Sequence, residues 1–197
     1  MTGQRRLSQA ISEGDGISLL VPAVDLEAVR RAEGDGAEGV VVDGDLAGVR
    51  DATGLPILWR GPSSPAEALS LGADACLVTA RQLEDDAPHV ERRYSEATDL
   101  GLECVVGVVD DDELEAALER LDPEIFLLSP GGQADGEDAL EQVLDLLPDV
   151  PAGKLAIADV RVTSREEVAE LERAGFDAVI VGTSDVAGLV GAAPPEV

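Results

Sequence analysis

Eight short apolar runs recur along the whole chain, and they constrain the fold more than any other feature of the sequence. Most of them are rich in β-branched residues. They are continuous rather than alternating, which is typical of strands covered on both faces of a parallel sheet. Each run therefore predicts a β-strand, and the runs are Ile17–Val21, Val40–Val42, Pro56–Trp59, Ala75–Val78, Cys104–Val109, Ile125–Leu128, Leu155–Ala158 and Ala178–Val181.

Helix-like stretches lie between these runs and carry apolar residues at i, i+3 and i+4. Two of them begin at serine caps: Ser64 precedes a first-turn proline, and Thr163 or Ser164 precedes a pair of glutamates. The segment from Asp86 to Leu100 is polar and irregular. The clearest helical stretches are Leu26–Ala32, Pro65–Leu71, Asp112–Leu121, Glu137–Leu147 and Ser164–Ala174.

Strand and helix thus alternate about every 20–25 residues, the rhythm of βα units. Eight such units favour a closed (β/α)8 TIM barrel of the α/β class over an open doubly wound sheet. We expect residues 1–197 to form one small barrel domain with short loops. For residues 1–15 two alternatives stay open, disorder or a short helix.

The acidic composition limits the partners that this surface can bind. Asp and Glu number 41 against 14 Lys and Arg, a net charge of −27, and the sole lysine is Lys154. Such a surface repels phosphates, so we expect no nucleic acid partner. We interpret the acidity as halophilic adaptation to a salt-rich cytoplasm, where charges are screened. The excess of arginine over lysine is explained equally well by a GC-rich genome.

Other sequence features exclude further classes of function. No apolar run reaches the roughly 18–20 residues of a membrane span, and the arginines near the start precede no apolar segment, so we expect a cytoplasmic protein without membrane contact. We expect Cys76 and Cys104 to be buried and unpaired. With His89 as the lone histidine, we expect neither a metal nor a cofactor, and Asp110–Asp112 to cap a helix.

From about Gly36 to Ser184 the chain resembles indole-3-glycerol phosphate synthase, a (β/α)8 enzyme of tryptophan biosynthesis. The resemblance rests on the stretches LPILWRG, LGADACLVTARQL, LGLECVVGVVDDDELEAAL and SREEVAELERAGFDAVIVGTS. It implies a phosphorylated substrate and a ring closure that releases carbon dioxide and water. From the resemblance we expect this chain to lack the N-terminal helical extension of that family.

The resemblance also implies that most catalytic groups of the family are replaced. Arg60 stands where the family has its catalytic lysine, and its pKa is too high for proton donation near neutrality. Gly107 replaces a glutamate, Ser129–Gly131 replace an Asn-Asn-Arg phrase, and the first strand lacks the expected acid and lysine. Asp159 falls where the seventh strand of the family carries a glutamate.

A phosphate site is the second feature that the resemblance implies. Gly182, Thr183 and Ser184 fall on a Gly-x-Ser phrase after the eighth strand, where such barrels hold phosphate on backbone N–H groups. Arg161 stands where the family usually has glycine, and it either adds a contact to the anion or fills the pocket. A turn and helix N-cap is the alternative for Gly182–Ser184.

Three functional hypotheses follow from these residues. The first is a synthase-like barrel that has lost the reaction and binds a phosphorylated metabolite or serves as a regulatory or scaffold subunit. The second is an active lyase or isomerase that uses Arg60 and Asp159 on a phosphorylated substrate. The third, phosphoribosylanthranilate isomerase-like activity, ranks last because the first strand has no cysteine and the sixth ends in Ser129. For Asp159, an ion pair with Arg60 or Arg161 is favoured over a general base.

Overall fold

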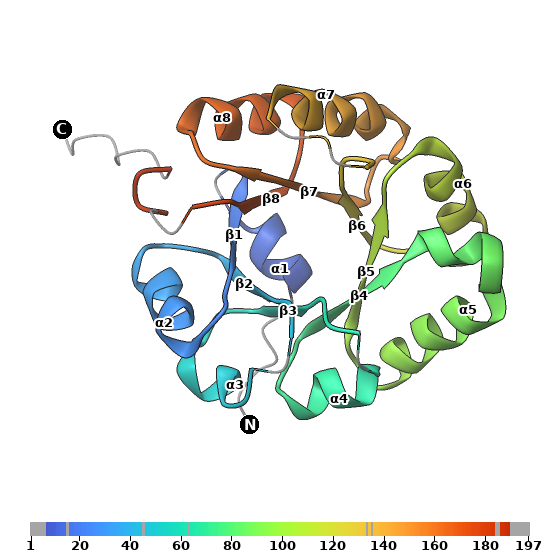
Figure 1. The fold of residues 1–197 in the computed structure, drawn as a ribbon, viewed down its shortest axis with the longest axis horizontal. Helices are drawn as coiled ribbons and strands as arrows, with labels where there is room; N and C mark the ends of the chain where they lie inside the picture. The colour runs from blue at the N-terminus through green and yellow to red at the C-terminus, as the bar shows by residue number, and fades with distance from the viewer. Residues whose placement is uncertain are drawn as a thin grey trace.

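The strands close into the predicted barrel. The computed structural model describes residues 7–14, 16–44, 46–62, 64–132, 134, 136–183 and 186–189. Within them eight parallel strands pair in chain order, and β8 returns to pair with β1 (Figure 1). The (β/α)8 prediction is confirmed. The strands are β1 Ser18–Pro22, β2 Gly39–Val42, β3 Ile57–Trp59, β4 Ala75–Thr79, β5 Glu103–Val108, β6 Ile125–Leu128, β7 Leu155–Val162 and β8 Ala178–Val181.

Helices surround the barrel, except for α1, which lies inside the ring of strands in the view of Figure 1. The five predicted helices are present, and the irregular segment near residue 86 is one long helix that kinks at Asp86, close to Pro88. The described helices are α1 Leu7–Ser12, α2 Leu26–Gly34, α3 Val49–Ala52, α4 Pro65–Ser70, α5 Leu83–Asp99, α6 Asp111–Arg120, α7 Glu137–Leu146 and α8 Arg165–Ala174, with 3-10 turns η1 Ala80–Gln82 and η2 Leu147–Asp149.

Local side-chain caps explain where several helices begin. Ser64 and Ser164 each form a capping box with a glutamate three residues later. The Asp110 carboxylate accepts the Glu113 N–H at 2.9 Å, so the expected capping role of the aspartate run is confirmed. Gly175 ends α8 in the left-handed conformation at φ 108°.

Alternation along the strands produces two buried layers. One layer faces the helices and includes Trp59, which is 2% exposed. The other fills the barrel interior, where Leu20, Leu58 and Ile157 meet residues from the neighbouring strands. Because successive side chains point to opposite faces, the residue two positions beyond an interior one faces the barrel axis as well.

The N-terminal end of the barrel is closed by α1. Leu7 and Ile11 join the interior layer, and the Ser8 backbone N–H donates to the Glu103 carboxylate at 3.1 Å. The Ser8 hydroxyl donates to the same carboxylate. Of the two alternatives for the N-terminal segment, the described residues 7–12 adopt the helix.

Two further expectations are decided by the fold. Cys76 and Cys104 are buried, lie opposite each other on β4 and β5, and are both free, as predicted. Among the described helices, none combines the length and apolar character needed to cross a membrane.

Candidate functional site

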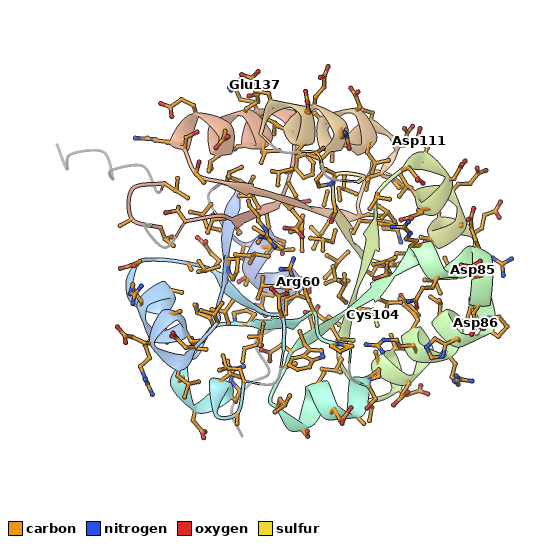
Figure 2. All side chains as sticks on the ribbon, viewed as in Figure 1. Arg60, Asp85, Asp86, Cys104, Asp111 and Glu137 are labelled. Carbon is orange, nitrogen blue, oxygen red and sulfur yellow. The ribbon has the colours of Figure 1, made fainter. Side chains whose placement is uncertain are left out.

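A cavity of about 380 Å³ opens at the C-terminal ends of the strands. Along β3 and β7 every second side chain points inward, and this alternation brings Arg60 and Asp159 to the wall of the cavity. Figure 2 shows Arg60 inside the ring of strands. Catalytic groups of (β/α)8 enzymes come from this end of the barrel. We call this cavity the mouth; its polar lining residues are Asp43, Arg60, Thr79, Ser129, Asp159 and Arg161.

Arg60 is held between two carboxylates. Its Nε and Nη2 donate to the Asp43 carboxylate at 2.6 and 3.0 Å, and its Nη1 donates to Asp159 Oδ2 at 2.7 Å. The Arg60 side chain is only 10% exposed, against 16% for Asp159 and 59% for Asp43. Burial by itself would lower the pKa of Arg60, but the hydrogen bonds and charges of Asp43 and Asp159 outweigh it and raise that pKa. The guanidinium is therefore a fixed cation.

Asp159 has one oxygen in this ion pair and one left over. Its Oδ1 is buried and has no hydrogen-bond partner within the described part of the chain. An unpaired buried acceptor of this kind is costly and is uncommon in folded proteins. The expected pairing of Asp159 with arginine is present.

Arg161 reaches the mouth through an irregular stretch of β7. That strand runs to Val162, four residues beyond the predicted end, with a register shift against β8 after Ala158. Arg161 has φ 50°, a left-handed conformation that is uncommon for a residue with a side chain. Its side chain is exposed and makes no ion pair with any other described residue. It is thus a cation available at the rim.

Gly182 forms a hydrogen bond within the sheet and also lines a cavity at the rim. Its N–H donates to the Val162 carbonyl at 2.8 Å, so this amide is not free to bind an anion. A Cβ on Gly182 would lie 2.2 Å from the Arg161 carbonyl oxygen, which is why β8 can approach β7 so closely here only with glycine. Ser184, the last residue of the expected phosphate site, lies outside the described residues.

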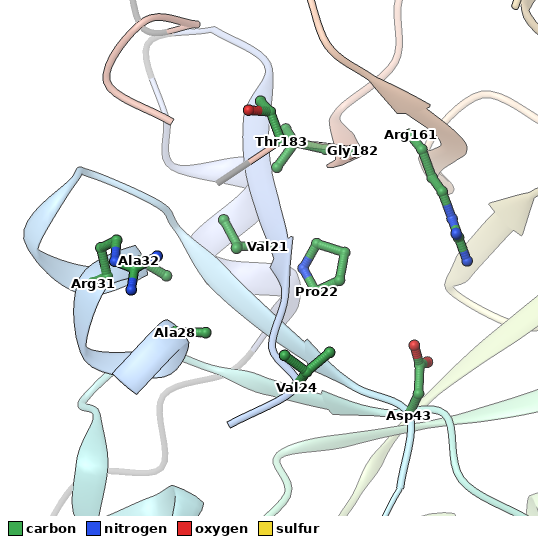
Figure 3. A pocket seen from close by; sticks show the side chains of 11 residues that line it. Val21, Pro22, Val24, Ala28, Arg31, Ala32, Asp43, Arg161, Gly182 and Thr183 are labelled. Carbon is green, nitrogen blue, oxygen red and sulfur yellow. The ribbon is translucent and has the colours of Figure 1, made fainter. Parts of the chain in front are cut away.

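A second cavity, of about 280 Å³, lies between α2, β1 and the end of β8 (Figure 3). Gly182 and Thr183 line it, and it shares Asp43 and Arg161 with the mouth. Figure 3 shows the Arg161 side chain extending toward Asp43. Apart from Ser184, the sequence-predicted site residues therefore fall at one end of the barrel, but in two adjoining cavities.

Asp43 is the site residue that the sequence reasoning missed. It directly follows the run Val40–Val42, two positions beyond the interior residue Val41, and this phase points it into the mouth. The spacing of two residues from Val41 could have identified Asp43 from the sequence. It did not stand out because acidic residues occur throughout this chain.

Two indole-3-glycerol phosphate synthases are similar in sequence to this chain. The indole-3-glycerol phosphate synthase from Geobacillus sp. (strain WCH70) is 30% identical over 145 residues, which are 72% of this chain and 55% of that protein. The synthase from Shouchella clausii (strain KSM-K16) is 28% identical over 141 residues, 70% of this chain and 54% of that protein. The chain thus spans about half the length of the curated relatives it matches.

A solved structure extends the likeness of fold. The mutant tryptophan synthase alpha-subunit from the hyperthermophile Pyrococcus furiosus superimposes with a TM-score of 0.62 at 16% identity, covering 86% of this chain and 87% of that one. The profile of the indole-3-glycerol phosphate synthase family matches residues 61–187, from the end of β3 to beyond β8. Because that match covers most of the barrel, the chain belongs to the indole-3-glycerol phosphate synthase family.

Proposed function

We propose that this chain binds a phosphorylated small metabolite at the mouth and has lost the synthase reaction. The observation that carries the proposal is the state of Arg60. It occupies the position that the resemblance gives to the catalytic lysine, and there it is buried between Asp43 and Asp159. A guanidinium with a raised pKa cannot deliver a proton as a lysine ammonium does.

The surroundings of Gly107 support the same proposal. A Cβ at this position would lie 3.3 Å from Leu77 Cδ1, so the Leu77 side chain occupies space beside the position where the resemblance expects a glutamate. Groups that act as a unit in catalysis are strongly non-additive, and the loss of several costs orders of magnitude in rate. Two replaced positions therefore predict a very low rate of ring closure.

Arg161 supports the phosphate part of the proposal. An unpaired guanidinium at the rim of a strongly acidic protein is a local site of positive potential. Thr183, the residue after Gly182, lines the adjoining cavity. Since the Gly182 N–H is engaged by Val162, the proposed site depends on the Arg161 side chain more than on backbone amides.

Two assays test the proposal. First, the purified chain is incubated with the anilino-deoxyribulose phosphate substrate of the synthase, and we expect no indole-3-glycerol phosphate above the uncatalysed background. Second, inorganic phosphate and glycerol 3-phosphate are titrated calorimetrically. We expect saturable binding that Arg161→Gln weakens about tenfold, the loss of one charge-assisted contact.

Either assay can overturn its part of the proposal. Turnover at an ordinary enzymatic rate would contradict the loss of the reaction. Absence of phosphate binding, or equal binding by the Arg161→Gln variant, would contradict the metabolite site and would favour the regulatory or scaffold hypothesis instead.

An altered lyase or isomerase reaction is a second candidate, favoured by the unpartnered Asp159 Oδ1. The Asp159 carboxylate lines the mouth and could accept a proton there, while Arg60 holds this carboxylate in place through Oδ2. Asp159→Asn separates the candidates, because it would abolish turnover of a phosphorylated substrate by more than about a hundredfold if Asp159 is the base. A matched change at Asp149, on the opposite end of the barrel, should leave turnover unchanged.

A further inference from the structure

Two carboxylates of the mouth pair with one guanidinium. Asp43 and Asp159 share the single guanidinium of Arg60, so two negative charges are set against one positive charge. Asp159 Oδ1 is buried without a partner in the described residues, and the Asp43 carboxylate is more than half exposed. The hydrogen-bonding groups that these two carboxylates leave without a described partner are acceptors.

A second cation, Arg161, lines the mouth together with these carboxylates. Arg161 belongs to the rim, where it also lines the cavity next to Gly182 and Thr183. Among the described residues that line the mouth, it is the cation without an ion-pair partner. The mouth thus has an anion-binding rim and an interior suited to hydrogen-bond donors.

Asp43 blocks the edge of Arg60 that a ligand carboxylate would use. The Nε and Nη2 groups form the side of a guanidinium that binds carboxylates in the bidentate mode, and Asp43 already occupies both of them. A second anionic group on a ligand would have to displace Asp43 and would then approach Asp159. Like-charge contacts of this kind exclude wrong partners.

We infer that the ligand is a phosphate ester whose remaining groups are hydroxyls or amines, with no second anionic group, and that Asp43 determines this specificity. The inference rests on the proposed function, because the phosphate is assigned to the rim at Arg161. A hydroxyl or amine then donates to Asp159 Oδ1, while Asp43 keeps the Nε edge of Arg60 closed. The Asp43 carboxylate thus excludes ligands that carry a second anionic group.

The test compares two small phosphate esters that differ in one terminal group. Glycerol 3-phosphate has a hydroxymethyl group where 3-phosphoglycerate has a carboxylate. Calorimetric titration is done in about 0.5 M KCl, so that the overall negative charge of the protein does not dominate the comparison. We expect the wild-type chain to prefer glycerol 3-phosphate by about tenfold or more. In Asp43→Asn the preference should fall to about threefold or less, because 3-phosphoglycerate binds more tightly.

A matched variant controls for the loss of one negative charge. Asp149 is an exposed residue of η2, at the opposite end of the barrel, and Asp149→Asn should keep the full preference. Thermal unfolding of each variant verifies that it is folded, and Asp43→Ser is a second change at the same exposed position.

The outcomes separate the two proposals. Equal affinity for the two esters in the wild-type chain, or an unchanged preference in both folded Asp43 variants, would overturn the specificity role while the phosphate site stands. If neither glycerol 3-phosphate nor inorganic phosphate binds the wild-type chain, the proposed function fails and this inference fails with it.

Discussion

At the N-terminal end of the strands α1 fills the barrel with Leu7 and Ile11, whereas at the C-terminal end charged side chains face a cavity. The two ends also differ in how their carboxylates are hydrogen-bonded. At the closed end the Glu103 carboxylate receives the Ser8 N–H and hydroxyl, while at the open end Asp159 Oδ1 has no described partner. The closed end thus combines close packing with satisfied polar groups, whereas the open end keeps a buried carboxylate oxygen without a described partner.

Leu7→Ala should have the largest effect on this comparison. The side chain is fully buried in the interior layer, so its truncation leaves a cavity and should lower the free energy of unfolding by about 2–5 kcal/mol. The control is Arg161→Gln at the open end, which should change it by less than about 0.5 kcal/mol. Urea unfolding of both variants measures the difference. Similar costs at the two ends would contradict the assignment of stability to the closed end.

Gly182→Ala should have the next largest effect, although Gly182 lies at the open end, where we otherwise expect small changes in stability. The new Cβ would meet the Arg161 carbonyl oxygen, a backbone atom that cannot move aside cheaply, so we expect a cost of about 1–3 kcal/mol. Gly131→Ala is the matched control, since its Cβ would make an ordinary contact at 3.8 Å. If thermal unfolding shows equal stability for the two variants, the close approach of β7 and β8 at Gly182 is not a constraint.

Salt should stabilise the whole chain, in contrast to these local changes. With a net charge of −27, self-repulsion is strong at low ionic strength and is screened within about 3 Å at molar salt. We expect the melting temperature to rise by at least about 2–4 °C from low to molar KCl, which corresponds to about 1 kcal/mol. A flat response in differential scanning calorimetry would refute the halophilic interpretation.

Glu38→Gln should have the smallest effect, and it tests how a partly buried carboxylate at the closed end contributes to stability. Burial raises the pKa of Glu38 above its ordinary value of 4.5, although the Leu19 N–H donates to its carboxylate and opposes the shift. The folded state therefore binds this proton more tightly than the unfolded chain does. The resulting stabilisation is present below pH 4.5 and is lost as the pH rises through the raised pKa.

The measurement is the difference in unfolding free energy between the wild-type chain and Glu38→Gln at a series of pH values. Relative to the variant, the wild-type chain should lose about 0.5 kcal/mol as the pH rises from about 4 to 7, a value reduced for solvent screening. The opposite slope would mean that the hydrogen bond from Leu19 outweighs burial.

Much of the barrel could be predicted because its signals are local. Continuous apolar runs mark the strands, and Ser64, Asp110 and Ser164 mark helix starts through side chains that bond to amides three residues away. Arg60 and Asp159 were singled out through the resemblance, which aligns them with functional positions of the family on the third and seventh strands. α3 was missed, since a four-residue helix has no periodicity to detect.

The sequence by itself determined the number and order of the βα units, the acidic surface and the membership of a phosphate-binding barrel family, since each depends on composition or near neighbours. Only the tertiary structure decided the chemistry of the mouth. The pairing of Arg60 with Asp43 and Asp159 joins residues 17 and 99 positions apart. The engagement of the Gly182 amide likewise depends on how β7 and β8 meet. Such contacts depend on barrel closure and strand register, which no local pattern encodes.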